Sequence, residues 1–109
     1  MLIVFANSKG GVGKSTLSVH LAVWLFDHGV KVALLDADKQ RSSSDWIREA
    51  EPKITVARAL RPEEVASAAQ NLRQSHDFVI ADAPGRLEDE SRAMLILADL
   101  VIFPIMPSI

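Results

Sequence analysis

The chain has 109 residues, of which 49% are hydrophobic and 24% charged, and its net charge is −2. This length suits one domain, and the high apolar fraction excludes a disordered chain. The absence of cysteine excludes disulfides, thiolate metal sites and cysteine-ligated clusters, and the small negative charge gives no general attraction to nucleic acid.

The first half of the chain alternates predicted strands with predicted helices. The apolar run Leu2–Ala6 is typical of a strand buried on both faces, and a helix is predicted from Lys14 to about His28. Gly29 is expected to cap that helix at its C-terminus. A second buried strand is predicted over Lys31–Leu35, followed by a short helix over Ser42–Ala50.

The second half repeats this rhythm. Residues Ile54–Arg58 alternate as in an edge or half-buried strand, and Pro62 is well placed in the first turn of the next helix. A buried strand is predicted over Phe78–Ala81, a helix over Glu88–Ala98 and a last strand over Leu100–Ile105.

Strands that alternate with helices in this way indicate an α/β fold, a parallel sheet with helices on both faces. Neither a repeat nor a linker divides the sequence, so we expect a single domain over residues 1–109. The apolar runs are far shorter than the roughly 20 residues of a membrane span, and no signal peptide is recognisable. We therefore expect a cytoplasmic protein without a membrane partner.

A glycine-rich loop joins the first predicted strand to the first predicted helix. Its sequence, Lys9-Gly10-Gly11-Val12-Gly13-Lys14-Ser15-Thr16, follows the sense of the G-x-x-x-x-G-K-S/T phosphate loop, with Ser8 in place of the leading glycine. Glycines let backbone N–H groups approach phosphate oxygens, Lys14 would reach the β- and γ-phosphates, and Ser15 would ligate Mg²⁺. The predicted nucleotide-binding residues are Gly10, Gly11, Val12, Gly13, Lys14, Ser15 and Thr16. A flexible glycine turn is the alternative.

Through Lys9–Thr16 the sequence resembles the ParA/MinD family of deviant Walker ATPases, whose signature is K-G-G-x-G-K-S/T. The resemblance implies a P-loop NTPase-type fold that binds ATP and Mg²⁺. It also implies that Lys9 acts in trans, reaching the partner's phosphates across a nucleotide-sandwich dimer as an arginine finger does. The alternative for Lys9 is a solvated lysine beside a glycine loop.

Two acidic segments follow predicted strands, where ligands of α/β sheets bind. Asp36-Ala37-Asp38-Lys39-Gln40 resembles the family's D-x-D-x-Q element, with Lys39 in place of the usual proline. The resemblance makes Asp38 the residue that positions the attacking water, and it gives Asp36 a supporting role there or in the Mg²⁺ shell. Alternatively, both carboxylates only cap the helix over Ser42–Ala50.

The second acidic segment, Phe78–Gly85, resembles the family's Walker B strand and switch region. A lone aspartate after four apolar residues is costly to bury without a cation or donors, and Mg²⁺ held through a water would partner Asp82. The segment Ala98–Ser108 resembles a further family strand and is given no chemistry. Trp24 lies on an apolar helix face with Leu17 and Leu21, so we expect it in the core.

The resemblance implies a partition-type ATPase that dimerises around ATP, hydrolyses it slowly and acts in plasmid or chromosome segregation. It further implies a centromere-binding partner protein and non-specific DNA binding in the full-length family. The match covers only the N-terminal half of such proteins, so we expect an incomplete sheet whose open edge favours self-association, including strand exchange. The alternative is a non-catalytic nucleotide-binding or assembly module that lacks the base pocket and the DNA-binding half.

Overall fold

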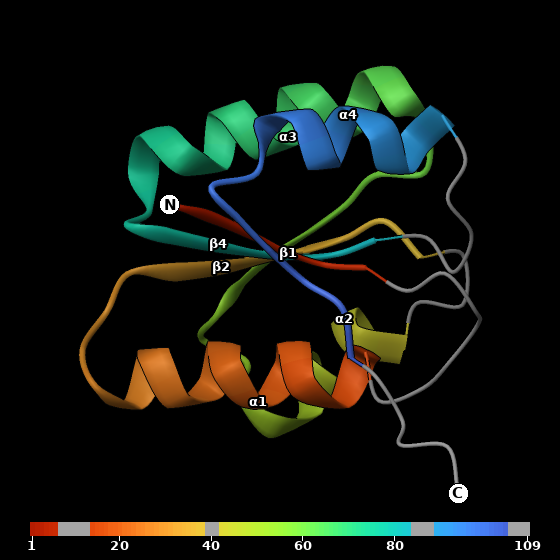
Figure 1. Cartoon of the computed structure of the whole chain (residues 1–109). Helices are drawn as coiled ribbons and strands as arrows, with labels where there is room; N and C mark the ends of the chain where they lie inside the picture. The colour runs from red at the N-terminus through yellow and green to blue at the C-terminus, as the bar shows by residue number, and fades with distance from the viewer. Residues whose placement is uncertain (7–13, 39–41, 84–88, 105–109) are drawn as a thin grey trace, which may run out of the picture.

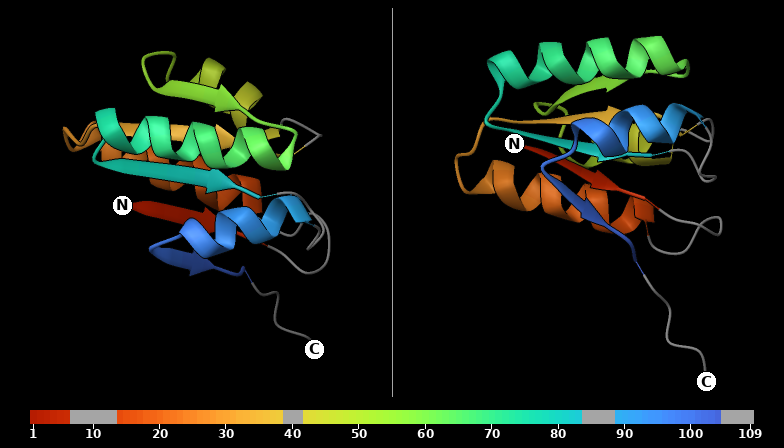
Figure 2. Two further views of the ribbon diagram at one scale, coloured as in Figure 1. Left: turned by 90° about the horizontal axis from the view of Figure 1, so that it is seen from above. Right: turned by 45° about the horizontal axis from the view of Figure 1, so that its top comes forward.

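Five strands form one parallel sheet in the order β3-β2-β4-β1-β5 (Figures 1 and 2). The computed structural model describes residues 1–6, 14–38, 42–83 and 89–104. The strands are β1 (Leu2–Phe5), β2 (Val32–Asp36), β3 (Thr55–Arg58), β4 (Phe78–Asp82) and β5 (Leu100–Ile102). The predicted parallel sheet is therefore confirmed, and so is the edge position of the third strand.

Helices cover both faces of the sheet, as predicted. They are α1 (Lys14–Asp27), α2 (Ser42–Ala50), α3 (Pro62–Ser75) and α4 (Asp89–Leu97). In Figure 1, α3 and α4 lie on one face, whereas α1 and α2 lie on the other. No helix within the described parts of the chain is long and apolar enough to cross a membrane.

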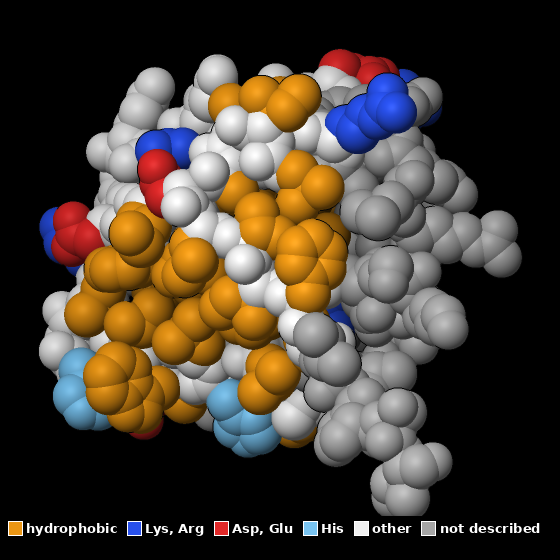
Figure 3. Space-filling model, in the orientation of Figure 1, with side chains coloured by type: hydrophobic (Ala, Val, Ile, Leu, Met, Phe, Trp, Pro, Cys, Tyr) orange, Lys and Arg blue, Asp and Glu red, His pale blue; other side chains and the backbone are white. Residues whose placement is uncertain are grey.

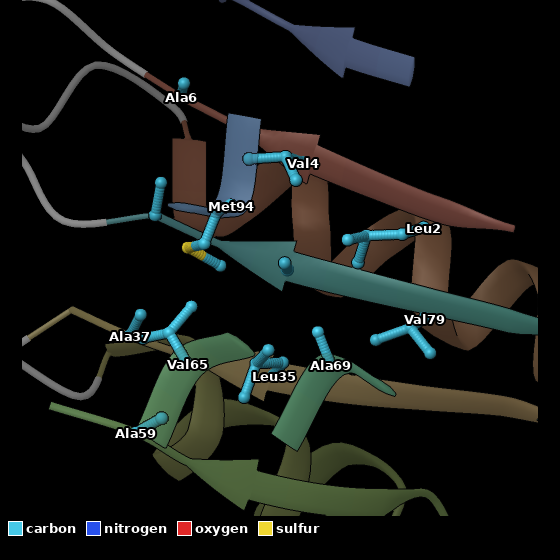
Figure 4. Close-up of a cluster of buried hydrophobic side chains, with 12 residues drawn as sticks. Leu2, Val4, Ala6, Leu35, Ala37, Ala59, Val65, Ala69, Val79 and Met94 are labelled. Carbon is cyan, nitrogen blue, oxygen red and sulfur yellow. The ribbon is translucent and has the colours of Figure 1, made fainter. Parts of the chain in front are cut away.

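Two apolar clusters hold these layers together, one on each face. Because successive strand side chains point to opposite faces, Leu2 and Val4 belong to one cluster and Ile3 and Phe5 to the other. The cluster beneath α3 and α4 includes Met94 and is shown in Figure 4. Strands buried on both faces explain why the runs in β1, β2 and β4 lack polar alternation.

The end of α1 follows the predicted glycine cap. Gly29 has a φ of 80°, a backbone conformation that glycine adopts without strain. Its N–H donates to the Phe26 carbonyl, and the N–H of Val30 donates to the Leu25 carbonyl. This pair of bonds is a Schellman motif, and it turns the chain directly into β2.

The prediction that Trp24 lies in the core is wrong. Its side chain is 56% exposed and its ring packs against His28, with the centroids 4.1 Å apart. Leu17, from the same predicted stripe, is 45% exposed. The buried side of α1 instead carries small residues such as Ser18 and Ala22, which let the helix lie close to the sheet.

The β5 edge of the sheet borders a broad apolar surface. Figure 3 shows hydrophobic side chains gathered over α1 and β5 on one face of the molecule. Leu17, Trp24, Leu100 and Phe103 are all at least 45% exposed. A surface of this kind is unusual on an isolated monomer and is typical of regions that pack against further polypeptide.

Candidate functional site

The site is built where two neighbouring strands end beside the start of α1. Parallel pairing places Asp36 at the end of β2 directly opposite Asp82 at the end of β4. The first two residues of α1, Lys14 and Ser15, reach the same point. Residues from sequence positions far apart therefore meet at the carboxyl edge of the sheet, where the acidic segments were predicted to lie.

Lys14 is the centre of this arrangement. Its Nζ lies 2.7 Å from Asp82 Oδ1 and 3.0 Å from Asp38 Oδ2, and it also donates to the Ala83 carbonyl. The lysine is only 2% exposed, so its charge is balanced by carboxylates rather than by water. A buried ammonium at a helix N-terminus between two acids forms a charge cluster that an anion can rearrange.

Asp82 is held from a second side by Ser15, whose hydroxyl donates to Oδ2 at 3.0 Å. Burial raises the pKa of Asp82 above 3.8, and the charge of Lys14 together with hydrogen bonds from neighbouring side chains offsets part of that rise. Although Oδ1 lies close to the Lys14 charge, it accepts no hydrogen bond from the described residues. A donor such as a metal-bound water could therefore take the place of Lys14 at this oxygen.

Asp36 joins the strand end to the next helix. Its Oδ1 accepts the Asp38 N–H and its Oδ2 accepts the Ser44 N–H, each at 3.0 Å. The second contact satisfies a free N–H in the first turn of α2, which is the capping role that the sequence left open. The first contact fixes the backbone of Asp38 beside Lys14. That Asp36 takes part in the coordination shell of Mg²⁺ stays a prediction.

Arg58, at the end of the edge strand β3, binds the start of α2 beside Asp36, a role that sequence reasoning missed. Its Nε donates to Ser44 Oγ at 2.8 Å, and its guanidinium pairs with Asp45 at 2.5 Å. The sequence places Arg58 at the end of a predicted strand, but its register with Asp36 is known only from the pairing of the strands in the structure. Arg58 thereby holds the start of α2 against β3.

Several predicted residues fall outside the parts that the structure describes. Lys9 and the glycine stretch Gly10–Gly13 belong to residues 7–13, and Lys39 belongs to residues 39–41. Thr16, within α1, is exposed. The described members of the predicted nucleotide site are therefore Lys14, Ser15 and Thr16.

The donor set fits a magnesium ion that comes with a phosphate ligand. Among the described residues, no group of three or more acidic, histidine or cysteine side chains is arranged to hold a metal ion alone. Mg²⁺ usually keeps several waters and is held by one or two carboxylates with substrate phosphates. The hydroxyl of Ser15 and the carboxylate of Asp82 match that requirement.

Known proteins are similar to this chain over nearly its whole length. The model of the CobQ/CobB/MinD/ParA nucleotide binding domain matches residues 3–102. The chain is 36% identical to Protein ParA of Rhizobium radiobacter and 32% identical to Maintenance of carboxysome distribution protein A of Halothiobacillus neapolitanus. Each match covers 97% of this chain, but 49% and 50% of those proteins. The chain thus spans about half the length of these curated relatives.

Solved structures show the same fold. The MinC:MinD cell division protein complex of Aquifex aeolicus matches with a TM-score of 0.73 at 22% identity, over 94% of this chain and 55% of that chain. Signal recognition particle 54 kDa protein of Aeropyrum pernix also gives 0.73 at 22% identity, over 94% of this chain and 28% of its own. At these identities the likeness establishes the P-loop fold alone.

Proposed function

The chain belongs to the CobQ/CobB/MinD/ParA nucleotide-binding domain family, and from that premise we propose that it binds ATP with Mg²⁺ and hydrolyses the ATP slowly. The observation that carries this proposal is the buried cluster of Lys14, Asp38 and Asp82. In this cluster one ammonium and two carboxylates lie together. Phosphoryl transfer needs this combination, because its catalysis rests on positioning and charge stabilisation.

Each described residue then has a separate task. Lys14 leaves its carboxylates and neutralises the β- and γ-phosphate oxygens, whose negative charge replaces that of the two aspartates. Ser15 and Asp82 would hold Mg²⁺, which would neutralise phosphate charge during transfer. Asp38, fixed through its backbone by Asp36, orients the attacking water once Lys14 has moved to the phosphates. Lys9 stabilises the partner's phosphates in trans.

An assay of phosphate release from ATP, applied to single-residue variants, distinguishes the roles proposed for these residues. The wild-type chain should release phosphate from Mg-ATP, Lys14→Ala should neither bind nor turn over, and Asp38→Asn should bind without turnover. Lys31→Ala is the matched control, because Lys31 is exposed and directly precedes β2, whereas the site lies at the other end of that strand. Turnover in Asp38→Asn at the wild-type rate would refute the role given to Asp38.

We further propose that the activity serves partition, as in a ParA-type plasmid or chromosome segregation system. The likeness to Protein ParA over nearly the whole chain supports this reading. A centromere-binding partner and non-specific DNA are the expected contacts in the full-length family. Base recognition can be tested by comparing the affinities of the chain for ATP, GTP and inorganic triphosphate. Equal affinities would indicate that the chain binds the phosphates and has no pocket for the base.

A non-catalytic nucleotide-binding module is the second candidate. The matches to these curated relatives cover about half of each relative's length. Binding of Mg-ATP without phosphate release, at concentrations where the chain dimerises, would support this candidate over the ATPase.

The apolar surface over α1 and β5 supports a homodimer, either a nucleotide sandwich or a strand-exchanged pair. Leu100 and Phe103 flank the open edge of the sheet and are nearly half exposed. Open strand edges and exposed apolar patches both favour association. Light scattering should therefore show a dimer or larger species without nucleotide, and a clean monomer would contradict self-association through this edge.

A further inference from the structure

Two buried polar atoms of the site lack a hydrogen-bond partner within the described residues. They are Asp82 Oδ1 and the hydroxyl oxygen of Ser43, and both residues are fully buried. An unsatisfied buried polar atom costs free energy, so its presence in a folded protein calls for an explanation. Asp82 Oδ1 has the Lys14 ammonium 2.7 Å away, so the hydroxyl of Ser43 is the atom that calls for an explanation.

The fold brings these two atoms together. Ser43 lies in the first turn of α2, and the N–H of the next residue, Ser44, is bound by Asp36. Asp36 in turn is the register partner of Asp82 in the neighbouring strand. The Ser43 hydroxyl is near enough to lower the pKa of the Asp82 carboxyl against the effect of burial, although the two groups make no well-formed hydrogen bond.

We propose that Ser43 is a further binding residue of the magnesium site, where its hydroxyl and Asp82 Oδ1 together hold one water of the Mg²⁺ hydration shell. This inference rests on the proposed function and deepens it. A buried water needs two to four polar partners, and a hydroxyl that can both donate and accept beside a carboxylate oxygen meets that need. Residues that orient such waters tune metal affinity without touching the ion.

The serine run itself supplies a matched comparison. Ser44, the neighbour of Ser43, is equally buried, but its hydroxyl accepts the hydrogen bond from Arg58 Nε at 2.8 Å. Removing the Ser44 hydroxyl therefore breaks a structural hydrogen bond, whereas removing the Ser43 hydroxyl breaks no well-formed hydrogen bond among the described residues. The two alanine variants lose the same atom from adjacent buried positions and should behave in opposite ways.

The test measures binding of a fluorescent ATP analogue over a series of Mg²⁺ concentrations, together with the thermal midpoint of the unliganded chain. Ser43→Ala should need about tenfold more Mg²⁺ for half-maximal binding. Its unliganded midpoint should equal or exceed that of the wild type, because an unsatisfied hydroxyl has been removed. Ser44→Ala should show a lowered midpoint and a wild-type Mg²⁺ requirement.

An unchanged Mg²⁺ requirement in Ser43→Ala would overturn the inference and leave the proposed ATP binding intact. A midpoint of Ser43→Ala as low as that of Ser44→Ala would overturn it too, since the hydroxyl would then be structural. If the wild-type chain binds the analogue equally well with Mg²⁺ and with a chelator, the proposed magnesium-dependent function fails, and the inference fails with it.

Discussion

Replacing Lys14 by methionine should destabilise the unliganded protein by about 3–5 kcal/mol at pH 7, because a buried carboxylate loses its counter-charge. The structure supports a loss of this size. Nζ lies 2.7 Å from Asp82 Oδ1 and 3.0 Å from Asp38 Oδ2. At an effective dielectric constant of about 20, one such pair interacts by roughly 6 kcal/mol, and the desolvation of the buried ions offsets part of that attraction.

Urea unfolding at pH 7 measures this loss against two controls. Lys31→Met removes an exposed lysine and should stay within about 0.5 kcal/mol of the wild type. The double variant Lys14→Met/Asp82→Asn removes both charges of the 2.7 Å pair and should recover more than half of the loss. A Lys14→Met variant within about 1 kcal/mol of the wild type would refute the reasoning, since surface pairs contribute no more than that.

The same variant carries a pH signature. The pKa of Asp82 is already raised by burial, and removing Lys14 takes away its largest opposing influence. A carboxyl whose pKa is higher in the folded than in the unfolded protein stabilises the fold at a pH below its unfolded pKa. That stabilisation is lost as the pH rises through its folded pKa. The deficit of Lys14→Met should therefore shrink as the pH is lowered, and a deficit independent of pH would contradict this cause.

Three further predictions concern other parts of the chain. Lys9→Ala should keep nucleotide binding and lose ATP-dependent dimerisation. If the variant sediments with ATP as the wild type does, the role of Lys9 in trans is refuted. Gly29→Ala should cost about 1–2 kcal/mol in urea unfolding, because φ is 80° and the added Cβ meets no atom within 4 Å, which leaves backbone strain as the cause. Asp99 has a lowered pKa because the Leu2 N–H donates to it and Arg73 lies beside it. The contribution of Asp99 to the stability of the fold is present above pH 3.8 and is lost as the pH falls through the pKa of Asp99 in the folded protein. The thermal midpoint of Asp99→Asn should therefore fall less on acidification than that of the wild type.

The sheet could be predicted because its sequence signals are local. Continuous apolar runs mark β1, β2 and β4, and the glycine cap marks the end of α1. The orientation of α1 could not be predicted, since apolar residues occur all round that helix. Trp24 and Leu17 form as regular a stripe as the buried side does. Ser18 and Ala22 lie inward because small side chains allow the helix to approach the sheet closely.

Some residues of the candidate site could likewise be predicted from the sequence, and others could not. Lys14, Ser15 and Asp82 could be found because phosphate and Mg²⁺ chemistry constrains their residue types and spacing. The contacts of Asp36 with two backbone N–H groups, and the brace from Arg58, depend on which strands pair and in what register. A single sequence holds no local signal for that pairing, so these supporting residues emerge only from the fold.

The central claim is that this chain binds Mg-ATP through the cluster around Lys14. Calorimetric titration of the wild-type chain with ATP, in the presence of Mg²⁺ and then of a chelator, tests it most directly. The account predicts saturable binding that is weakened by the chelator, abolished in Lys14→Ala and preserved in Lys31→Ala. Absence of binding in the wild-type chain, or equal binding in Lys14→Ala, would contradict it.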